Sequence, residues 1–327
     1  MKRYEVVGIG NAIVDVIAEC DEEFLARMAI TKGIMQLIER ERAEALYAAM
    51  GERIEAPGGS VANTVAGAAA LGLRAGFIGR VRDDALGRYY AAAMEEEGAA
   101  FVNPPVAGGE LPTSRSMIFV SPDGERSMNT YLGISSELGP DDVADDVAGD
   151  CDWLFLEGYI YDKPGGKQAF ERAARLCREA GGKAGITLSD PFCVDRHRGD
   201  FRLLVRELDY VIGNREEWES LYECDLSAAL EQAARDAGIV VCTRSGDDVV
   251  LIRGDEVAQA PVTRITPVDA TGAGDLFAAG FLYGMARGRP LAEAGRMGCI
   301  AAAEVISHFG ARPEADLKAL FAREGLG

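Results

Sequence analysis

Residues 269–282 read Asp-Ala-Thr-Gly-Ala-Gly-Asp-Leu-Phe-Ala-Ala-Gly-Phe-Leu, a glycine-rich turn that leads directly into an apolar helical stretch. Gly272, Ala273 and Gly274 carry little side-chain bulk, so their backbone N–H groups can all point at one anion. The start of a helix adds unpaired donors and the positive end of its dipole. This arrangement suits phosphoryl transfer, in which the amides would hold the charge of the moving phosphate and Asp275 would take the proton from an attacking hydroxyl.

The same stretch has a purely structural interpretation. Small residues before a helix permit close packing, and an aspartate at that place often only caps the helix. The physics of this segment alone leaves both interpretations open, because short motifs also occur by chance.

A second segment, residues 58–87, contains four further short motifs. They are Gly58-Gly59-Ser60-Val61-Ala62-Asn63-Thr64, Ala69-Ala70-Leu71-Gly72, Phe77-Ile78-Gly79-Arg80-Val81 and Asp84-Ala85-Leu86-Gly87. Together the two segments resemble the N-terminal and C-terminal signatures of the ribokinase-like (PfkB) carbohydrate kinase family. They stand in the right order, about two hundred residues apart, and the resemblance covers essentially the whole chain.

The composition is typical of a large globular domain. The chain has 327 residues, of which 48% are hydrophobic and 27% charged, and its net charge is −19. This is enough for one large core, so we expect a single domain over residues 1–327. A broad negative field repels phosphate backbones, which excludes nucleic acid as a partner and requires that any nucleotide site be built locally.

The cysteine and histidine content narrows the chemistry. The seven cysteines are scattered, with no Cys-x-x-Cys pair, which indicates free thiols and a cytoplasmic protein. Only two histidines, His197 and His308, are present, so a catalytic base would have to be a carboxylate. No apolar run reaches membrane-spanning length, and the stretch 6–20 is interrupted by Asp15 and Glu19. We therefore expect a first strand there, and neither a signal peptide nor a membrane anchor.

Short β-rich runs alternate with alanine-rich helical stretches along most of the chain. The expected strands are 4–8, 76–79, 153–157, 185–189, 210–213, 239–243 and 249–253. The expected helices are 62–71, 86–97, 167–180, 215–222, 228–237, 276–286, 291–307 and 317–323. This alternation predicts an α/β fold, with a doubly wound, mainly parallel sheet flanked by helices on both faces.

Two segments interrupt the alternation, at about 12–38 and 113–132. Both have the pattern of extra strands, and the second contains the turn Ser121-Pro122-Asp123-Gly124. The family resemblance implies that these insertions form a small β-sheet lid over the substrate.

Other phosphate-binding motifs are incomplete. Gly8-Ile9-Gly10 lacks the third glycine of a dinucleotide fingerprint, because position 13 is isoleucine. Gly166-Lys167 and Gly182-Lys183 lack the residues of a P-loop. The sequence therefore argues against a dehydrogenase, and ATP, if used, is held without a P-loop.

The residues predicted to hold the acceptor come from the N-terminal part of the chain. The opening Gly8-Ile9-Gly10-Asn11-Ala12-Ile13-Val14-Asp15 resembles the adenosine kinases of the family. That resemblance implies that Asp15, Gly59 and Asn63 hold sugar hydroxyls, with Asn11 and Gly58 in the same site. A carboxylate can accept from two vicinal hydroxyls, and an asparagine side chain both donates and accepts. The structural alternatives are a turn residue for Asp15 and a helix cap for Asn63.

Further contacts are implied around this site. Arg126 stands where adenosine kinases place a lid arginine near the transferring phosphate, and Tyr159 stands where they stack an aromatic ring on the base. A solvated hairpin arginine and a core aromatic are the alternatives. Met35 and Leu37 could supply apolar contacts.

The nucleotide side is implied by two further motifs. Asn214-Arg215-Glu216-Glu217 matches the family's Asn-x-x-Glu motif, in which Glu217 would bind Mg²⁺ through water; a capping asparagine is the alternative. Thr243 and Gly246 fall in the family's nucleotide turn, although Ser245 and Asp248 replace its usual glycines. Ala270 and Phe192 also depart from the family pattern. The departure at Ala270 concerns the response to monovalent cations such as potassium, and the departure at Phe192 argues against polar contacts at that position.

The resemblance implies a kinase that transfers the γ-phosphate of ATP to the 5′-hydroxyl of a nucleoside, with adenosine as the first candidate and Mg²⁺ as cofactor. Gly272, Ala273, Gly274 and Asp275 would carry out the transfer. Two alternatives stay open: a free sugar, keto-deoxy acid, guanosine or inosine as acceptor, and a non-catalytic sensor on the same fold. Dependence on K⁺, and the choice between monomer and homodimer, are left open by the sequence.

Overall fold

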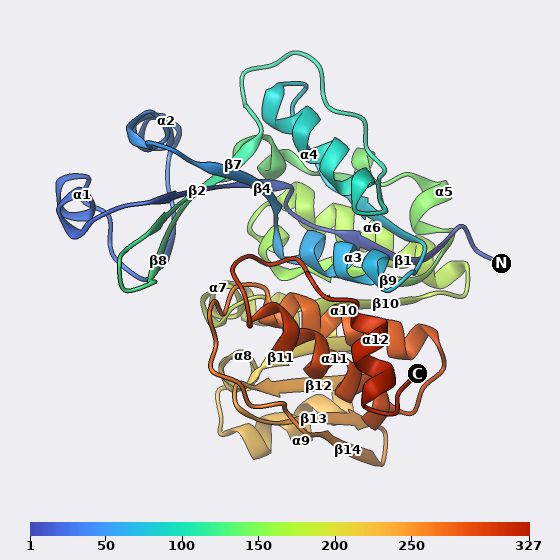
Figure 1. The fold of residues 1–327 in the computed structure, drawn as a ribbon. Helices are drawn as coiled ribbons and strands as arrows, with labels where there is room; N and C mark the ends of the chain where they lie inside the picture. The colour runs from blue at the N-terminus through green and yellow to red at the C-terminus, as the bar shows by residue number, and fades with distance from the viewer.

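A computed structural model describes residues 1–327 and contains a large and a small β-sheet (Figure 1). The large sheet has nine strands in the order β14-β13-β12-β11-β10-β9-β1-β5-β6. Its strands are β1 (Tyr4–Ile9), β5 (Ala75–Ile78), β6 (Ala99–Phe101), β9 (Cys151–Glu157), β10 (Lys183–Thr187), β11 (Tyr210–Asn214), β12 (Ile239–Arg244), β13 (Asp247–Arg253) and β14 (Glu256–Ala260). All pairings from β6 to β12 are parallel, whereas β13 and β14 are antiparallel additions at one edge.

Helices cover both faces of the large sheet. One face carries α3 (Ser60–Ala70), α4 (Ala85–Glu96), α10 (Ala273–Ala286) and α11 (Leu291–Val305), with α12 (Leu317–Arg323) packed outside them. The other carries α5 (Asp145–Ala148), α6 (Pro164–Glu179), α7 (Pro191–Glu207), α8 (Arg215–Tyr222) and α9 (Leu226–Asp236). Successive strand residues point to opposite faces, so Val6 belongs to one core and Val7 to the other. The predicted doubly wound, mainly parallel α/β fold is confirmed.

Sequence reasoning missed several elements of the large layer. Strands β6 and β14 are short edge strands, and α7 carries many charged residues and a non-helical residue, His197, that kinks it. Such segments give weak periodicity, which explains why the pattern did not reveal them.

The small sheet has five strands in the order β3-β8-β7-β2-β4. They are β2 (Ile13–Glu19), β3 (Met35–Leu37), β4 (Ile54–Gly58), β7 (Ser114–Val120) and β8 (Arg126–Tyr131). Val14 and Val16 point to the outer face, where they share a core with residues of α1 (Glu22–Arg27) and α2 (Arg40–Ala49). In Figure 1 this unit projects to one side of the large sheet.

The predicted boundaries of the insertions, 12–38 and 113–132, were too narrow. They supply β2, β3, β7 and β8, but α2 and the edge strand β4 lie outside them. Strand β4 contains Pro57 and ends at Gly58, residues that weaken any strand signal and are tolerated at a sheet edge.

The carboxyl ends of the parallel strands face the small sheet. Asn11 follows β1, Glu157 ends β9 and Asn214 ends β11, and all three line one cavity at this edge. In open α/β sheets this edge is where ligands bind.

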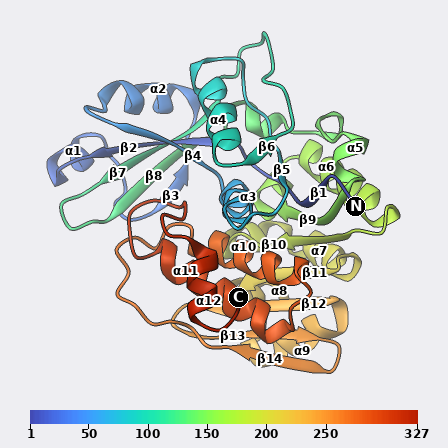
Figure 2. The ribbon, with the colours of Figure 1, turned by 45° about the vertical axis from the view of Figure 1, so that its right-hand side comes forward.

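Helices α10 and α11 cross at very close range. A Cβ at Gly280 would lie 2.5 Å from the Met297 carbonyl oxygen, and one at Gly298 would lie 2.7 Å from the Phe277 carbonyl oxygen. Figure 2 shows α10 beside α3 as well. The crossing therefore holds the start of α10, and the glycine-rich turn before it, in a definite position.

We predict that Gly280→Ala lowers the free energy of unfolding by roughly 1–3 kcal/mol, because the added methyl group pushes the two helices apart. The matched control is Gly199→Ala in α7, where no atom lies within 4 Å of the new Cβ; it should be neutral or stabilise by up to about 1 kcal/mol. Urea unfolding of both variants measures this. Equal effects of the two substitutions would contradict the close crossing.

Candidate active site

Two cavities meet at the carboxyl edge of the large sheet. The first, of about 660 Å³, lies between the two sheets, and the second, of about 700 Å³, lies between the β13 side of the large sheet and helices α10 and α11. Asn214, Thr243 and Gly274 line both cavities. Ligands bound in the two cavities would therefore come together beside Gly274.

The glycine-rich turn presents open amide donors at this junction. Gly272 is the N-cap of α10 with φ +80°, which glycine adopts without strain. The N–H groups of Gly272, Gly274 and Asp275 have no hydrogen-bond partner in the protein, whereas that of Ala273 donates to the Ala270 carbonyl at 3.4 Å. The open donors are thus the amides of Gly272, Gly274 and Asp275. The prediction named Gly272, Ala273 and Gly274, so Asp275 takes the place of Ala273 in this set.

Asp275 lies between this turn and the start of α3. Its Oδ1 accepts from the Ser60 hydroxyl at 2.7 Å, and its Oδ2 accepts from Nδ2 of Asn63 at 2.8 Å. Burial raises the pKa of Asp275 to about 6, although these two hydrogen bonds and Arg312 lower it. The carboxylate lines the first cavity and is ionised at neutral pH, as a general base must be.

Asp15 faces the same cavity from β2 and accepts no hydrogen bond from the protein. A Cβ at Gly58 would lie 2.5 Å from its Oδ2, so glycine is required there to leave room for the carboxylate. Gly59 has φ +101° and packs against the Asn11 carbonyl. Burial raises the pKa of Asp15 to about 7, against the opposing effect of Arg126 and Arg312. Asp15 therefore offers free acceptor oxygens to a ligand, and its predicted role in holding a sugar hydroxyl stays a prediction.

Asn63 and Asn11 both line the first cavity but differ in their hydrogen bonds. Asn63 donates to Asp275, and its buried Oδ1 has no partner, so one acceptor remains for a ligand hydroxyl. The Asn11 side chain is already partly engaged, because Nδ2 donates to Glu157 at 2.7 Å and Oδ1 accepts from Ser135 at 3.0 Å. Asn11 lines the cavity and supports Glu157, and one N–H of its side-chain amide has no partner in the protein.

Glu157 is a site residue that sequence reasoning missed. Only 1% exposed, it accepts from the backbone and side chain of Asn11 and from the Val61 amide at the start of α3. Burial raises its pKa to about 7. Its place at the carboxyl end of a buried strand was the available signal.

Arg126 does not line either cavity. Its guanidinium forms an ion pair with Asp269 at 2.8 Å, and the two side chains are only 11% and 4% exposed. Asp269 also accepts from the amides of Thr271 and Gly310. The predicted approach of Arg126 to a phosphate would require this ion pair to open.

Apolar side chains line the far end of the first cavity. Met35 and Leu37 reach it from the small sheet, and Tyr159 and Phe192 from the large-sheet side. Tyr159 is not plain core, since its ring lines the cavity while its hydroxyl donates to the Ser189 carbonyl at 3.3 Å. Phe192 is 77% exposed and takes part in no polar contact through its side chain.

Asn214 and Glu217 form a capping box at the start of α8. Asn214 accepts from the Glu217 amide, and the Glu217 carboxylate accepts from the backbone and side chain of Asn214. Burial raises the pKa of Glu217 to about 7. Each carboxylate oxygen carries one hydrogen bond and retains capacity for a metal-bound water, and no group of three ligands surrounds the place. These oxygen donors therefore fit a hydrated Mg²⁺ ion.

The second cavity is lined by apolar side chains and by a short turn between β12 and β13. Phe277 and Ala302 belong to the apolar part of the lining, and Thr243 and Gly246 also line the cavity. Ser245 adopts φ +53°, the conformation for which glycine is usual, while a Cβ at Gly246 would meet open space. This lining was not recognised in the sequence, because it comes from distant segments with no common motif.

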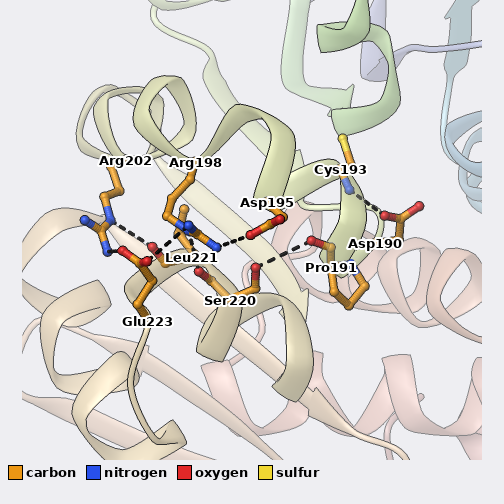
Figure 3. Close-up of polar contacts among 9 residues, drawn as sticks. All are labelled: Asp190, Pro191, Cys193, Asp195, Arg198, Arg202, Ser220, Leu221 and Glu223. Carbon is orange, nitrogen blue, oxygen red and sulfur yellow. Dashed lines mark hydrogen bonds and ion pairs between the residues drawn. The ribbon is translucent and has the colours of Figure 1, made fainter.

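Hydrogen bonds from two arginines of α7 hold this helix against the C-terminal end of α8 (Figure 3). Asp190 caps α7 by accepting from the Cys193 amide. Arg198 donates to the Ser220 carbonyl and Arg202 to the Leu221 carbonyl, both at 2.8 Å. Both arginines also bond Glu223. These contacts fix the relative positions of two helices whose first turns line the first cavity.

Comparison with known proteins places these features in context. The sequence profile of the pfkB family of carbohydrate kinases matches residues 30–317. An adenosine kinase from Sinorhizobium meliloti is 47% identical over 99% of both chains, with a TM-score of 0.90. A probable sugar kinase from Rhizobium etli CFN 42 is 46% identical over 100% of both chains, with a TM-score of 0.92. A 5-dehydro-2-deoxygluconokinase from Shouchella clausii is 24% identical over 94% of this chain and 90% of its own. No helix of the chain has the length and apolar character needed to span a membrane.

The raised pKa of Asp275 predicts a pH-dependent stability difference. Because the folded pKa lies above the unfolded value, ionisation of Asp275 opposes folding above about pH 6, and this cost disappears as pH falls toward 4. Asp275→Asn should therefore melt higher than the unsubstituted protein at pH 8, by on the order of 2–4 °C, and the difference should shrink at pH 5. Scanning calorimetry at both pH values measures it. The exposed Asp255→Asn serves as control, and a difference independent of pH would contradict the raised pKa.

Proposed function

From the premise that this chain belongs to the pfkB family of carbohydrate kinases, we propose that it transfers the γ-phosphate of ATP to the 5′-hydroxyl of a nucleoside, with adenosine giving AMP. An ATP-dependent phosphotransfer to an alcohol follows from the family itself; the nucleoside acceptor is the finer part of the proposal. The 47% identity with the Sinorhizobium meliloti adenosine kinase supports it.

One observation carries the proposal: Asp275 lines the first cavity directly beside Gly274, which lines both cavities, and it lies between the open amides and the polar side chains of Asp15 and Asn63. An acceptor hydroxyl held by Asp15 and the free Oδ1 of Asn63 would lie near the Asp275 carboxylate. Asp275 would take its proton while the new oxygen–phosphorus bond forms and the bond to the leaving ADP breaks. The open amides of Gly272 and Gly274 would hold the charge on the transferred group.

The second cavity would take the nucleotide, with Thr243 and Gly246 in its lining and apolar residues under the base. Mg²⁺ would be held by Glu217 and Asn214, partly through water, and would neutralise phosphate charge when bound. Whether potassium is also needed is part of the test below, because Ala270 departs from the family pattern.

The charge of the first cavity favours a neutral acceptor. Six carboxyl side chains line it, at positions 15, 157, 162, 190, 217 and 275, and the one cation among the lining residues is Arg196. Arg196 already pairs with Asp162 at 3.1 Å. A carboxylate of a sugar acid would find no free cation there and several negative charges. A nucleoside or neutral sugar fits better than a gluconate-type acid, and Met35, Leu37 and Phe192 offer apolar surface to a base.

A sugar kinase with a neutral acceptor such as ribose or fructose is the second candidate, supported by the similarity to a probable sugar kinase. Guanosine or inosine as acceptor differ only at the base. A non-catalytic sensor is disfavoured, because it would not need Asp275 beside open amides. The seven free thiols agree with a cytoplasmic protein, and we leave monomer and homodimer as alternatives.

We predict that, in a panel of acceptors with coupled detection of ADP, adenosine is phosphorylated with the highest kcat/KM. Ribose, fructose and 5-dehydro-2-deoxygluconate should be poorer by about 10²-fold or more, since each lacks the base or carries a charge. The panel is run with and without potassium, and guanosine and inosine are included. A higher kcat/KM for the sugar acid would contradict the neutral-acceptor argument.

We predict that Asp275→Asn lowers kcat by about 10²–10⁴-fold, because the general base is lost, while nucleoside binding changes little. In the unsubstituted enzyme kcat/KM should fall as pH drops through about 6, where Asp275 becomes protonated. Steady-state kinetics from pH 5 to 8 and calorimetric titration with the nucleoside measure both. Near-normal turnover of the variant would reject the role of Asp275.

A further inference from the structure

The segment that follows α11, residues 309–312, lies between the two parts of the site. The Gly310 amide donates to Asp269 at 2.9 Å, just before the glycine-rich turn. Ala311 packs on the turn itself, since a Cβ at Gly272 would lie 2.8 Å from that of Ala311. This segment therefore rests on the amides that would receive the phosphate.

Arg312 extends from the same segment to residues 57–63, which we call the acceptor corner because Asn63 and Gly59 line the first cavity there. Its Nη1 donates to the Ala62 carbonyl of α3 at 2.7 Å, and its Nη2 donates to the Pro57 carbonyl of β4 at 3.3 Å. These two carbonyls stand on either side of Gly58 and Gly59. The planar guanidinium can reach two acceptors at once, which a lysine cannot do in the same geometry.

We propose that Arg312 is a positioning residue for phosphoryl transfer, a strut that sets the distance between the acceptor corner at 57–63 and the phosphate-binding turn at 269–274. This role rests on the proposed function. Arg312 touches neither the acceptor nor the nucleotide in this role; it acts through Ala62, Pro57 and the turn beneath Ala311.

The charge of Arg312 adds to its geometric role. Arg312 is the one cation that lowers the pKa of Asp275, opposing the larger effect of burial. The acids Asp15 on β2 and Glu157 on β9 lie nearby and carry raised pKa values of their own. Arg126 on β8 and Arg312 itself both lower the pKa of Asp15. Removal of Arg312 should therefore make Asp275 harder to ionise.

Arg312 is a partly buried cation whose hydrogen-bonding groups are not all satisfied. Its side chain is 18% exposed, and its nearest carboxylate is Glu97, with Nε to Oε2 at 3.6 Å. The buried Nε has no hydrogen-bond partner. Removing a guanidinium from water costs free energy when its hydrogen bonds are not all replaced. This cost is the second reason to assign Arg312 a role beyond packing.

The test compares Arg312→Gln, which removes the charge, with Arg312→Lys, which keeps the charge but loses the two-pronged contact. Both should lower kcat by about 10- to 100-fold, because the acceptor and phosphate are misaligned, with nucleoside Kd changed by less than about threefold. The acid limb of the pH profile should move up by roughly 0.5–1 pH unit in Arg312→Gln and stay near its original place in Arg312→Lys.

Arg82→Gln is the matched control, because Arg82 also donates to loop carbonyls, those of Leu111 and Val106. It should lower thermal stability without moving the acid limb. A pH shift in this control equal to that of Arg312→Gln would overturn the proposal, as would unchanged kcat and acid limb in Arg312→Gln. If Arg312→Gln does not fold, Arg312→Lys still tests the proposal, because a normal kcat in that variant would overturn the positioning role of Arg312.

A second readout separates this proposal from the proposed function. Titration of the Asp275 carboxyl by ¹³C NMR, assigned with Asp275→Asn, needs no substrate. An upward shift of its pKa in Arg312→Gln supports the role of Arg312, and no shift overturns it. If the unsubstituted enzyme phosphorylates no acceptor in the panel, the proposed function fails, while this titration still decides the effect of Arg312 on Asp275.

Discussion

The geometry of the site depends on one interaction, the pair of hydrogen bonds that α3 donates to the Asp275 carboxylate. Ser60 and Asn63 donate to its two oxygens, and the Thr64 hydroxyl donates to its main-chain carbonyl at 3.0 Å. These contacts are possible because α3 and α10 pack closely: a Cβ at Gly67 would lie 2.7 Å from Leu276 Cδ1. The acceptor corner and the open amides are thereby joined at a single carboxylate.

The concentration of carboxyl groups around this carboxylate has a physical cost. Asp15, Glu157 and Asp275 are each shifted toward the protonated form, chiefly by burial. Few cations offset them, because Arg126 is paired with Asp269 and Arg196 with Asp162. An acidic, poorly compensated pocket is consistent with function being favoured over stability at a site, and it is the basis of our proposal that the acceptor is neutral.

The small sheet and the C-terminal segment both converge on Asp269. Arg126 reaches it from β8 and Gly310 from the segment after α11, while Asp269 itself holds the Thr271 amide. The small sheet is thus linked to the turn that presents the open amides. This link explains why Arg126, predicted from the family resemblance to approach the phosphate, is found instead at the base of the turn.

The sequence by itself determined what depends on neighbours along the chain. The alternation of strands and helices predicted the fold class, because periodicity is a local property. The glycine-rich turn predicted a helix start with open amides at Gly272 and Gly274, although the Ala273 amide, predicted to be open, is bonded to Ala270. Only the tertiary structure decided which distant groups meet: Glu157 with Val61, Arg312 with Pro57 and Ala62, and the lining of the second cavity. Those contacts join segments from many parts of the chain, and they follow from how layers pack, which no local pattern encodes.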